Sequence, residues 1–448
     1  MKKIFFRTLY IAVAISIAVA CKPKLETPSA DKGSLDLTTY VAVGNSITSG
    51  YADNALYNAG QKVSFAKLLS EQFQLAGGGA FNVPYVGVNS VGIGSTRGAR
   101  LGLTYVTDCK GVTSLSPKPI AASGDATIFV PIYAADGPFH NIGVPGAKAI
   151  HVVVPGYGNP ANGAGNYNPF FYRMASAPIT ASMLSDAVAL NPTFFTLFIG
   201  NNDVLLYALS GGAQDVITPS AGSPGVGFDA SVDATLAGLT AGGAKGIIGT
   251  VPDITSLPYF TTVPYNGLVL DATQAAGLTA AYSSFGITFH EGANAFMIQD
   301  AAAPGGIRQI TSSEHVLLSV PQDSLKCKGW GSTKPITTQY VLTTAEITSI
   351  NNATTAYNVK LRSAATVFDL AFVDVNAFLK SAITGLTFDG INVSTTFVSG
   401  GAFSLDGVHL TPLGNALLAN QFIQSINAKY GSTLPELDVT KYHGVVFP

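Results

Sequence analysis

The chain has 448 residues, which is enough for one large domain or two ordinary ones. Only 11% of the residues are charged and the formal net charge is -2, so the chain has no basic stripe that could neutralise nucleic-acid phosphates, and we expect no nucleic-acid partner. Hydrophobic residues make up 47%, yet beyond the N-terminus no apolar run reaches the ~20 residues that span a bilayer.

The N-terminus predicts export. A basic start, MKKIFFR, is followed by the apolar run LYIAVAISIAVA and then by Cys21, which is typical of a signal peptide over residues 1–20. Because small residues precede the cysteine, the segment also resembles a bacterial lipoprotein signal, although Ala18 stands where leucine is usual. That resemblance implies a lipidated Cys21 and a membrane-anchored protein, either periplasmic or on the cell surface. A non-lipidated signal or an anchor helix is the alternative interpretation.

Residues 21–38 then comprise the lipidated cysteine and a flexible tether, since this stretch is polar and contains two prolines. Apolar strands alternate with helices along the rest of the chain. In chain order the pattern predicts a strand at 40–43, helices at 64–74 and 183–190, a strand at 194–200, a helix at 229–241, a strand at 246–251, a helix from 343 to about 364, a strand at 366–375 and a last helix at 411–430. This alternation predicts a doubly wound α/β domain, with a mostly parallel sheet sandwiched by helices, whose ligands bind at the carboxyl ends of the strands.

The domain is expected to cover residues 39–432, with insertions at about 92–139 and 289–338 that decorate the active face and a C-terminal tail at 433–448. Each insertion contains one cysteine, Cys109 or Cys327. An exported protein meets an oxidising compartment, so a disulfide is one interpretation and two buried free thiols are the other. Two cysteines supply too few ligands for a metal site, and we expect no metal.

Four short blocks carry candidate chemistry. Ser46 lies in GNSIT, directly after the first strand. The other blocks are NIGVPGA with Gly146, GNND with Asn202 at the tip of a buried strand, and DGVH from Asp406 to His409 before the last helix.

Each of these residues suits a role in nucleophilic catalysis. A serine nucleophile needs a histidine base, and that histidine needs a partner that fixes its tautomer. Of the six histidines only His409 has an aspartate, Asp406, three residues before it. An asparagine side chain at a strand tip, and backbone N–H groups beside glycine, can stabilise a developing oxyanion.

Together, and in this order, the four blocks resemble those of the SGNH hydrolases, also called GDSL esterases and lipases. The resemblance covers about residues 39–429 and implies that Ser46, His409 and Asp406 form a catalytic triad. It also implies an oxyanion hole of Ser46, Gly146 and Asn202, with no metal or organic cofactor. The sequence departs from the family at Asn45, where aspartate is usual.

The resemblance further implies hydrolysis of a carboxylic ester through an acyl-enzyme. The substrate could be a lipid, an acylated glycan or a small ester. The apolar, lightly charged composition and the two insertions favour a lid and an acyl pocket, with an apolar groove near Ser46. Two alternatives stay open, a polysaccharide O-deacetylase of the same fold and a non-catalytic surface lipoprotein that binds glycans.

Overall fold

The computed structural model describes residues 29–163, 165–388 and 390–448. The expected signal peptide, Cys21 and the first part of the expected tether lie outside these ranges. In the part of the chain that is described, no helix is both long and apolar enough to cross a membrane.

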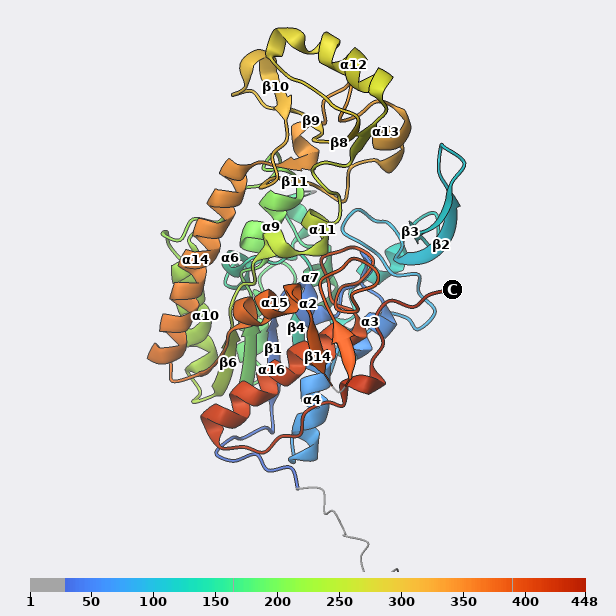
Figure 1. Ribbon diagram of the computed structural model, residues 1–448. Coiled ribbons are helices and arrows are strands. Elements are labelled where there is room, and N and C mark those ends of the chain that lie inside the picture. Colours follow the sequence, from blue (N-terminus) through green and yellow to red (C-terminus); the bar gives the residue numbers. More distant parts are fainter. Residues whose placement is uncertain (1–28, 164, 389) are drawn as a thin grey trace, which may run out of the picture.

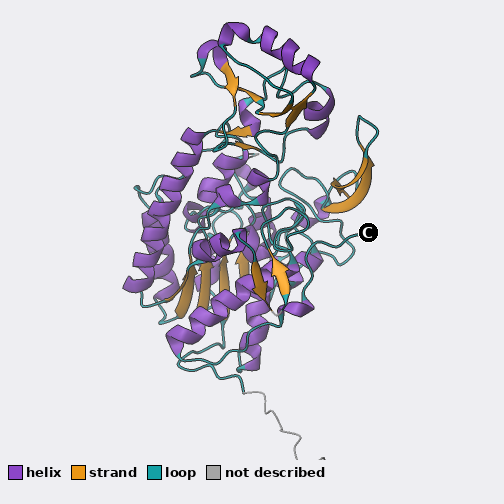
Figure 2. Cartoon of the chain, in the orientation of Figure 1, coloured by secondary structure: helices purple, strands orange, loops and turns teal. Residues whose placement is uncertain are grey.

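A parallel sheet of five strands forms the centre of the molecule (Figure 2). In spatial order its strands are β13 (Ala371–Val373), β6 (Lys245–Gly249), β5 (Phe194–Phe198), β1 (Tyr40–Gly44) and β4 (Asn141–Gly143). Both β1 and β5 are buried along their whole length, as parallel strands covered on two faces must be. The predicted doubly wound α/β fold is confirmed.

The strand order gives β1 a special position. The chain passes from β1 to β4 on one side and later returns to β5 on the other side of β1. Strand β1 is therefore the topological switch point, beside which a crevice opens at the carboxyl ends of the strands. The residues that follow β4, β1 and β5 all lie at that edge, because paired parallel strands end together.

Helices cover both faces of the sheet (Figure 1). On one face α4 (Phe65–Leu75) packs against α16 (Pro412–Tyr430), and on the other α10 (Phe228–Thr240) packs between α8 (Met183–Val188) and α14 (Thr344–Val367). Helix α16 has the start and stop that its sequence predicts, with Thr411 Oγ1 accepting the Gly414 N–H and Gly431 ending it in a left-handed conformation. The shorter helices are α2 (Ser46–Ser49), α3 (Asn58–Lys62), α5 (Tyr133–Asp136), α6 (Ala149–Val152), α7 (Pro169–Met174), α9 (Asn202–Leu209), α11 (Pro258–Thr261) and α15 (Val375–Ile383).

The strand predicted at 366–375 is shorter than expected. Helix α14 continues to Val367, Asp369 reverses the chain with a φ of 52°, and only residues 371–373 pair in the sheet. The helix continues because Ala364 and Ala365 extend its buried face by another turn. Strand β4, which the sequence pattern did not reveal, has only three residues.

Most of residues 263–342 form an upper lobe with two small cores of its own (Figure 1). One core contains Phe296, Ile298 and Ile336, and the other contains Leu270, Leu278 and Tyr282. Because the helix at 272–281 packs within the second of these cores, the insertion begins earlier than the expected residue 289. The lobe's elements are β7 (Leu268–Leu270), α12 (Ala272–Ala281), β8 (Gly292–Asn294), β9 (Met297–Gln299), β10 (Ile307–Gln309), β11 (His315–Val316), α13 (Gln322–Cys327) and β12 (Val341–Leu342).

Two antiparallel hairpins complete the periphery. The first, β2 (Leu101–Thr107) with β3 (Thr113–Pro119), lies in the expected first insertion and projects beside the upper lobe (Figure 1). The second, β14 (Leu386–Phe388) with β15 (Ile391–Val393), lies between α15 and α16 and had no counterpart among the predicted elements.

A disulfide joins the first hairpin to the upper lobe. Cys109 at the hairpin tip is bonded to Cys327 at the end of α13, with their Cα atoms 6.4 Å apart. Next to it, Lys326 Nζ lies 2.9 Å from Asp108 Oδ2. The two expected insertions are therefore linked covalently, 218 residues apart in sequence.

Both ends of the described chain pack on the domain. Leu35 and Leu37 are buried, and the Thr433 N–H donates to the Asp31 carbonyl at 2.8 Å. The tether, expected to extend to residue 38, therefore gives way to packed structure near Asp31. The segment 433–448, expected as a tail, also buries Leu434 and Leu437 against the core. Leucines at these positions explain the packing, since exposing them would forgo the free energy of apolar burial.

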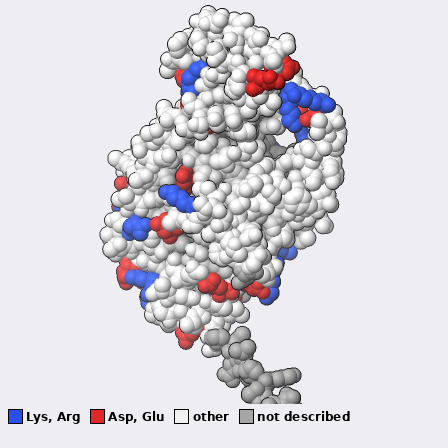
Figure 3. Space-filling view, in the orientation of Figure 1, with Lys and Arg blue, Asp and Glu red and all other residues white. Residues whose placement is uncertain are grey.

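The surface carries few charges. On the face shown in Figure 3, lysine, arginine, aspartate and glutamate form small scattered groups on an otherwise uncharged surface. Charged residues make up 11% of the chain, so uncharged polar residues must provide much of its solvation.

Replacing Cys109 and Cys327 together by serine is expected to lower the free energy of unfolding by about 2–5 kcal/mol, because the cross-link restricts the unfolded chain. Urea unfolding of the purified variant and of the oxidised wild type measures this difference. Wild type unfolded in the presence of a reductant should match the variant. Equal midpoints for the variant and the oxidised wild type would contradict a stabilising disulfide.

Candidate active site

Ser46 lies at the end of β1 and opens the short helix α2. Asn45 caps this helix, with its Oδ1 accepting the Ile47 N–H at 3.0 Å. An asparagine oxygen fills this role as well as an aspartate oxygen, which explains how the loop is held despite the departure at this position. Gly44 is required here, because a Cβ would lie 2.1 Å from Thr48 Oγ1 and 2.6 Å from the Phe198 carbonyl oxygen. The tight strand–helix turn thus leaves Ser46 at the switch point.

Ser46, His409 and Asp406 are joined by a continuous chain of hydrogen bonds. His409 Nε2 lies 2.9 Å from Ser46 Oγ, and His409 Nδ1 lies 2.8 Å from Asp406 Oδ2. A carboxylate can only accept, so it places the ring proton on Nδ1 and leaves Nε2 to accept the serine hydroxyl proton. The aromatic ring of Tyr51 packs against the imidazole, with centroids 4.7 Å apart.

Asp406 is largely shielded from solvent yet ionised. Burial alone would raise the pKa of Asp406, but His409 and the hydrogen bonds it receives hold that pKa well below its usual range. The Val408 and His409 N–H groups both donate to Oδ1, at 2.9 and 2.8 Å. Ser404 Oγ also donates to Oδ1, and the Asn54 N–H donates to Oδ2 at 2.8 Å.

A tight turn holds the DGVH loop from the opposite end of the chain. Asp53 and Asn54 both have positive φ, at 50° and 62°, in the two-residue turn that Ala52 and Ala55 close. Besides the bond from Asn54 to Asp406, the Asp53 N–H donates to Ser404 Oγ and the Leu405 N–H donates to Asp53 Oδ1, each at 3.0 Å. These contacts fix the aspartate of the DGVH block relative to the segment that carries Ser46.

The expected oxyanion donors line the same cleft. Ser46, Gly146, Asn202, Asp406 and His409 all contribute to one open cavity of about 470 Å³. Gly146 has a φ of 81°, a conformation that favours glycine. Asn202 begins α9 and donates one amide hydrogen to the Ala147 carbonyl at 2.9 Å, which leaves its second amide hydrogen for a ligand. The structure therefore brings together all five residues singled out from the sequence for triad and oxyanion roles.

Buried hydrogen bonds position the second and third blocks. Asn141 Nδ2 donates to the Thr48 carbonyl at 2.9 Å and so ties β4 to the nucleophile helix. Asp203 is fully buried and accepts the Ala149 N–H at 2.8 Å, which ties the start of α9 to the segment after Gly146. Burial raises the pKa of Asp203 to about 6. This aspartate holds the loops in place behind the cleft.

Both insertions reach the cleft. Ser95 and Thr96 come from the expected first insertion, and Leu318 and Ser319 come from the upper lobe. Trp330 packs within the upper lobe, near Tyr340. In the described parts of the chain, no three His, Cys, Asp or Glu side chains converge as metal ligands.

Sequence reasoning missed the residues that support the triad. Tyr51, Asn54 and Ser404 each contact His409 or Asp406. An Asp-Asn pair is a recognised turn signal, so the turn at Asp53 and Asn54 could have been found from the sequence. Its contact with Asp406, 352 residues further along the chain, could not. A narrow apolar cavity also adjoins Ser46, as expected. Its walls come in part from α15 and the second hairpin, and not from either expected insertion.

The family model described as GDSL-like lipase/acylhydrolase matches residues 40–422. A search of curated proteins found no match. Among solved structures, the chain is similar to a lipase/acylhydrolase from Enterococcus faecalis, with 10% identity over 89% of this chain and 99% of that one and a TM-score of 0.33. It is also similar to an extracellular lipase from Streptomyces rimosus, with 11% identity over 87% and 99% and a TM-score of 0.35.

The raised pKa of Asp203 predicts a dependence of the free energy of unfolding on pH. Between about pH 4 and pH 6 the Asp203 side chain is protonated in the folded state but ionised in the unfolded state. The stability that the protonated Asp203 side chain contributes is therefore complete below pH 4 and is lost as the pH rises through 6. Asp203→Asn cannot ionise and keeps an oxygen for the Ala149 N–H. The wild-type free energy of unfolding, relative to the variant, should fall by about 2 kcal/mol between pH 4 and pH 7.

Urea denaturation of both proteins at several pH values measures this difference. A difference that stays constant over the range would show that Asp203 has an ordinary pKa.

Proposed function

The chain belongs to the GDSL-like lipase/acylhydrolase family and acts on ester bonds, and we propose that it does so as an exported serine esterase with Ser46 as its nucleophile. The observation that carries the proposal is the hydrogen-bonded series from Ser46 Oγ through His409 to Asp406. A hydroxyl, an imidazole and a buried carboxylate in this order are what nucleophilic attack on an ester requires.

Acylation begins with attack of Ser46 Oγ on the ester carbonyl carbon. His409 Nε2 takes the serine proton as the C–O bond forms, and Asp406 stabilises the imidazolium that results. The tetrahedral intermediate collapses when His409 gives this proton to the leaving alcohol oxygen. The products of this step are an acyl-enzyme on Ser46 and a free alcohol.

The oxyanion of the intermediate is held by three donors, the N–H groups of Ser46 and Gly146 and the side-chain amide of Asn202. Support comes from their shared position on the cleft and from the remaining amide hydrogen of Asn202. Each such donor typically contributes about 10²–10³ in rate. Because hydrogen bonds and strand ends fix these groups before substrate arrives, little reorganisation is needed during the reaction.

Deacylation repeats the sequence with water. His409 Nε2 accepts a proton from water while the water oxygen attacks the acyl carbon, and the proton then returns to Ser46 Oγ as the C–O bond breaks. A carboxylic acid leaves and the enzyme is restored. The residues of the cleft provide every group that these steps use.

The proposal includes export and attachment to a membrane through Cys21. The basic and apolar segments before Cys21 support it, as does the disulfide, which is characteristic of proteins in oxidising compartments. The packed domain begins near Asp31, so a short segment separates the proposed anchor from the enzyme.

The first test is hydrolysis of p-nitrophenyl acetate and octanoate by the wild type, Ser46→Ala and His409→Ala. Each substitution should lower kcat at least about a thousandfold, since the triad acts as a unit. Ser313→Ala, an exposed serine in the upper lobe, serves as the matched control and should behave as wild type. A fluorophosphonate should label the wild-type peptide that contains Ser46. Full activity of Ser46→Ala would contradict the proposed nucleophile, and an inert wild type that no phosphonate labels would favour a binding protein.

Attachment through Cys21 is tested by feeding labelled palmitate to bacteria that express the full chain. The wild type should incorporate the label and sediment with membranes, whereas Cys21→Ser should do neither. Label that persists in the variant would place the lipid elsewhere, and unlabelled wild type would contradict the anchor.

A further inference from the structure

We infer that the substrate is an ester of an unbranched, medium-length fatty acid. Its acyl chain lies in the apolar cavity bounded by α15, α16 and the β14–β15 hairpin, and its alcohol lies in the open cleft. This inference rests on the proposed function, because it assigns the two halves of the ester to two sides of Ser46.

Two cavities meet at the nucleophile. The open cleft and the apolar cavity are separate, yet Ser46 and His409 line both. Asn202, Leu205 and Val408 are also common to the two. An ester whose carbonyl carbon sits at Ser46 therefore has two directions in which its substituents can extend, and each cavity accommodates one.

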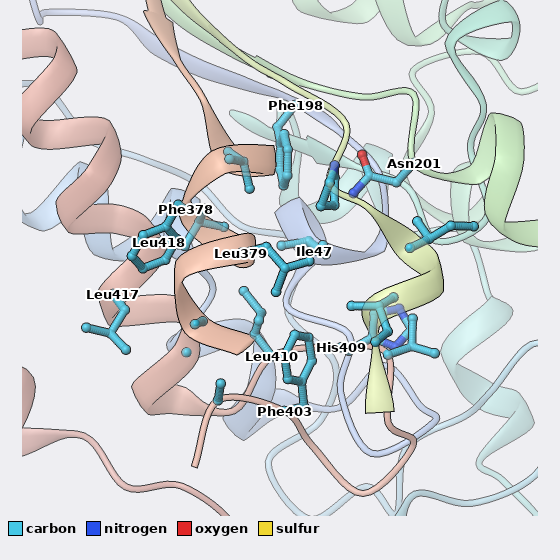
Figure 4. Close-up of a pocket in the computed structure, with 18 of the residues that line it drawn as sticks. Ile47, Phe198, Asn201, Phe378, Leu379, Phe403, His409, Leu410, Leu417 and Leu418 are labelled. Atoms are coloured by element: carbon cyan, nitrogen blue, oxygen red, sulfur yellow. The ribbon is translucent and has the colours of Figure 1, made fainter. Parts of the chain in front are cut away.

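The apolar cavity suits an alkyl chain. Apart from a few groups near Ser46, its walls consist of aliphatic and aromatic side chains. Figure 4 shows side chains from well-separated parts of the fold arranged around this space, among them Ile47, Phe198, Leu379, Phe403, Leu410 and Leu418. Burying methylene groups against such walls is favourable, whereas a sugar or charged group would lose its hydration there.

One stripe of α15 forms a wall of the cavity. Val375, Phe378, Leu379 and Ala382 line it, and their spacing of three and four residues places them on one stripe of the helix. From Val375 to Ala382 the stripe is about 10 Å long, at ~1.5 Å per residue. An extended chain advances about 1.2 Å per bond, so the stripe matches about eight carbon atoms. An acetyl group would leave most of this length unfilled.

The open cleft has a different lining. It exposes Asn54, Ser95, Thr96 and Ser319 as well as apolar side chains, and its volume is about 470 Å³. Its hydroxyl and amide groups can form hydrogen bonds with polar atoms of the alcohol, and its apolar side chains can contact the alcohol's carbon atoms. His409 borders this cleft, as it must if it is to protonate the departing alcohol oxygen.

The assignment predicts a strong dependence on acyl length. Each methylene that enters an apolar site contributes about a three- to fourfold gain in kcat/KM. We expect kcat/KM of the purified wild type to be at least about 30-fold higher for p-nitrophenyl octanoate than for the acetate, and to fall again for the palmitate. Ser46→Ala, measured alongside, separates enzymatic from background hydrolysis.

Ala382→Phe tests the cavity directly, because Ala382 lines it and the added ring would occupy part of its volume. The ratio of kcat/KM for octanoate to that for acetate should fall at least about tenfold. Ser381→Phe is the matched control, since Ser381 is the exposed neighbour on the same helix, and its ratio should equal that of wild type. Val393→Phe fills the cavity from the β15 wall and serves as a second variant if the first does not fold.

The possible outcomes separate the two proposals. Serine-dependent hydrolysis that is fastest on acetate would overturn the acyl assignment and leave the esterase intact. An octanoate-to-acetate ratio of kcat/KM that neither Ala382→Phe nor Val393→Phe lowers would also overturn the acyl assignment. The absence of any Ser46-dependent hydrolysis would overturn the proposed function itself, and the acyl assignment with it.

Discussion

The active-site geometry depends on how Asp406 is held. Its side chain is only 9% exposed, so the carboxylate stays ionised because His409, nearby N–H groups and a hydroxyl surround it. One of those donors, the Asn54 N–H, comes from a turn 352 residues earlier in the chain. That single turn therefore serves two purposes, since it stabilises a buried charge and aligns the histidine with a serine carried by the same N-terminal segment.

The sheet supplies the remaining alignment. Strands β4, β1 and β5 are neighbours and end at one edge, and each is followed at once by a block that faces the cleft. Small residues permit this crowding: a Cβ at Gly44 or Gly143 would collide with α2. Short segments with little freedom therefore carry the oxyanion donors and the nucleophile. Only the histidine arrives on a longer loop, and that loop is the one the Asp53–Asn54 turn holds.

The sequence predicted the motifs and the alternation of strands and helices well, but it predicted poorly which distant segments pack together. The four blocks were recognisable because they follow one another in a fixed order, with Ser46 and Asn202 at strand ends and His409 just before the last helix. The doubly wound fold followed from alternating apolar patterns. By contrast, the residues after Ala364 have both helical and strand character, and their packing against the sheet decided between the two. The packing of Leu35 and Leu37, like the cavity beside α15, depends on partners distant in sequence, which no local pattern encodes.

The disulfide divides the active site in a way that matters for proteolysis. The ring closed by Cys109 and Cys327 contains Gly146 and Asn202, whereas Ser46 and His409 lie outside it. A peptide bond cut between the two cysteines leaves a single covalent molecule with its loops still attached. A cut in the β14–β15 hairpin, by contrast, leaves His409 and α16 held to Ser46 by non-covalent packing alone. Ser46 and His409, which lie on either side of the ring, are therefore the parts of the active site that depend on an intact backbone.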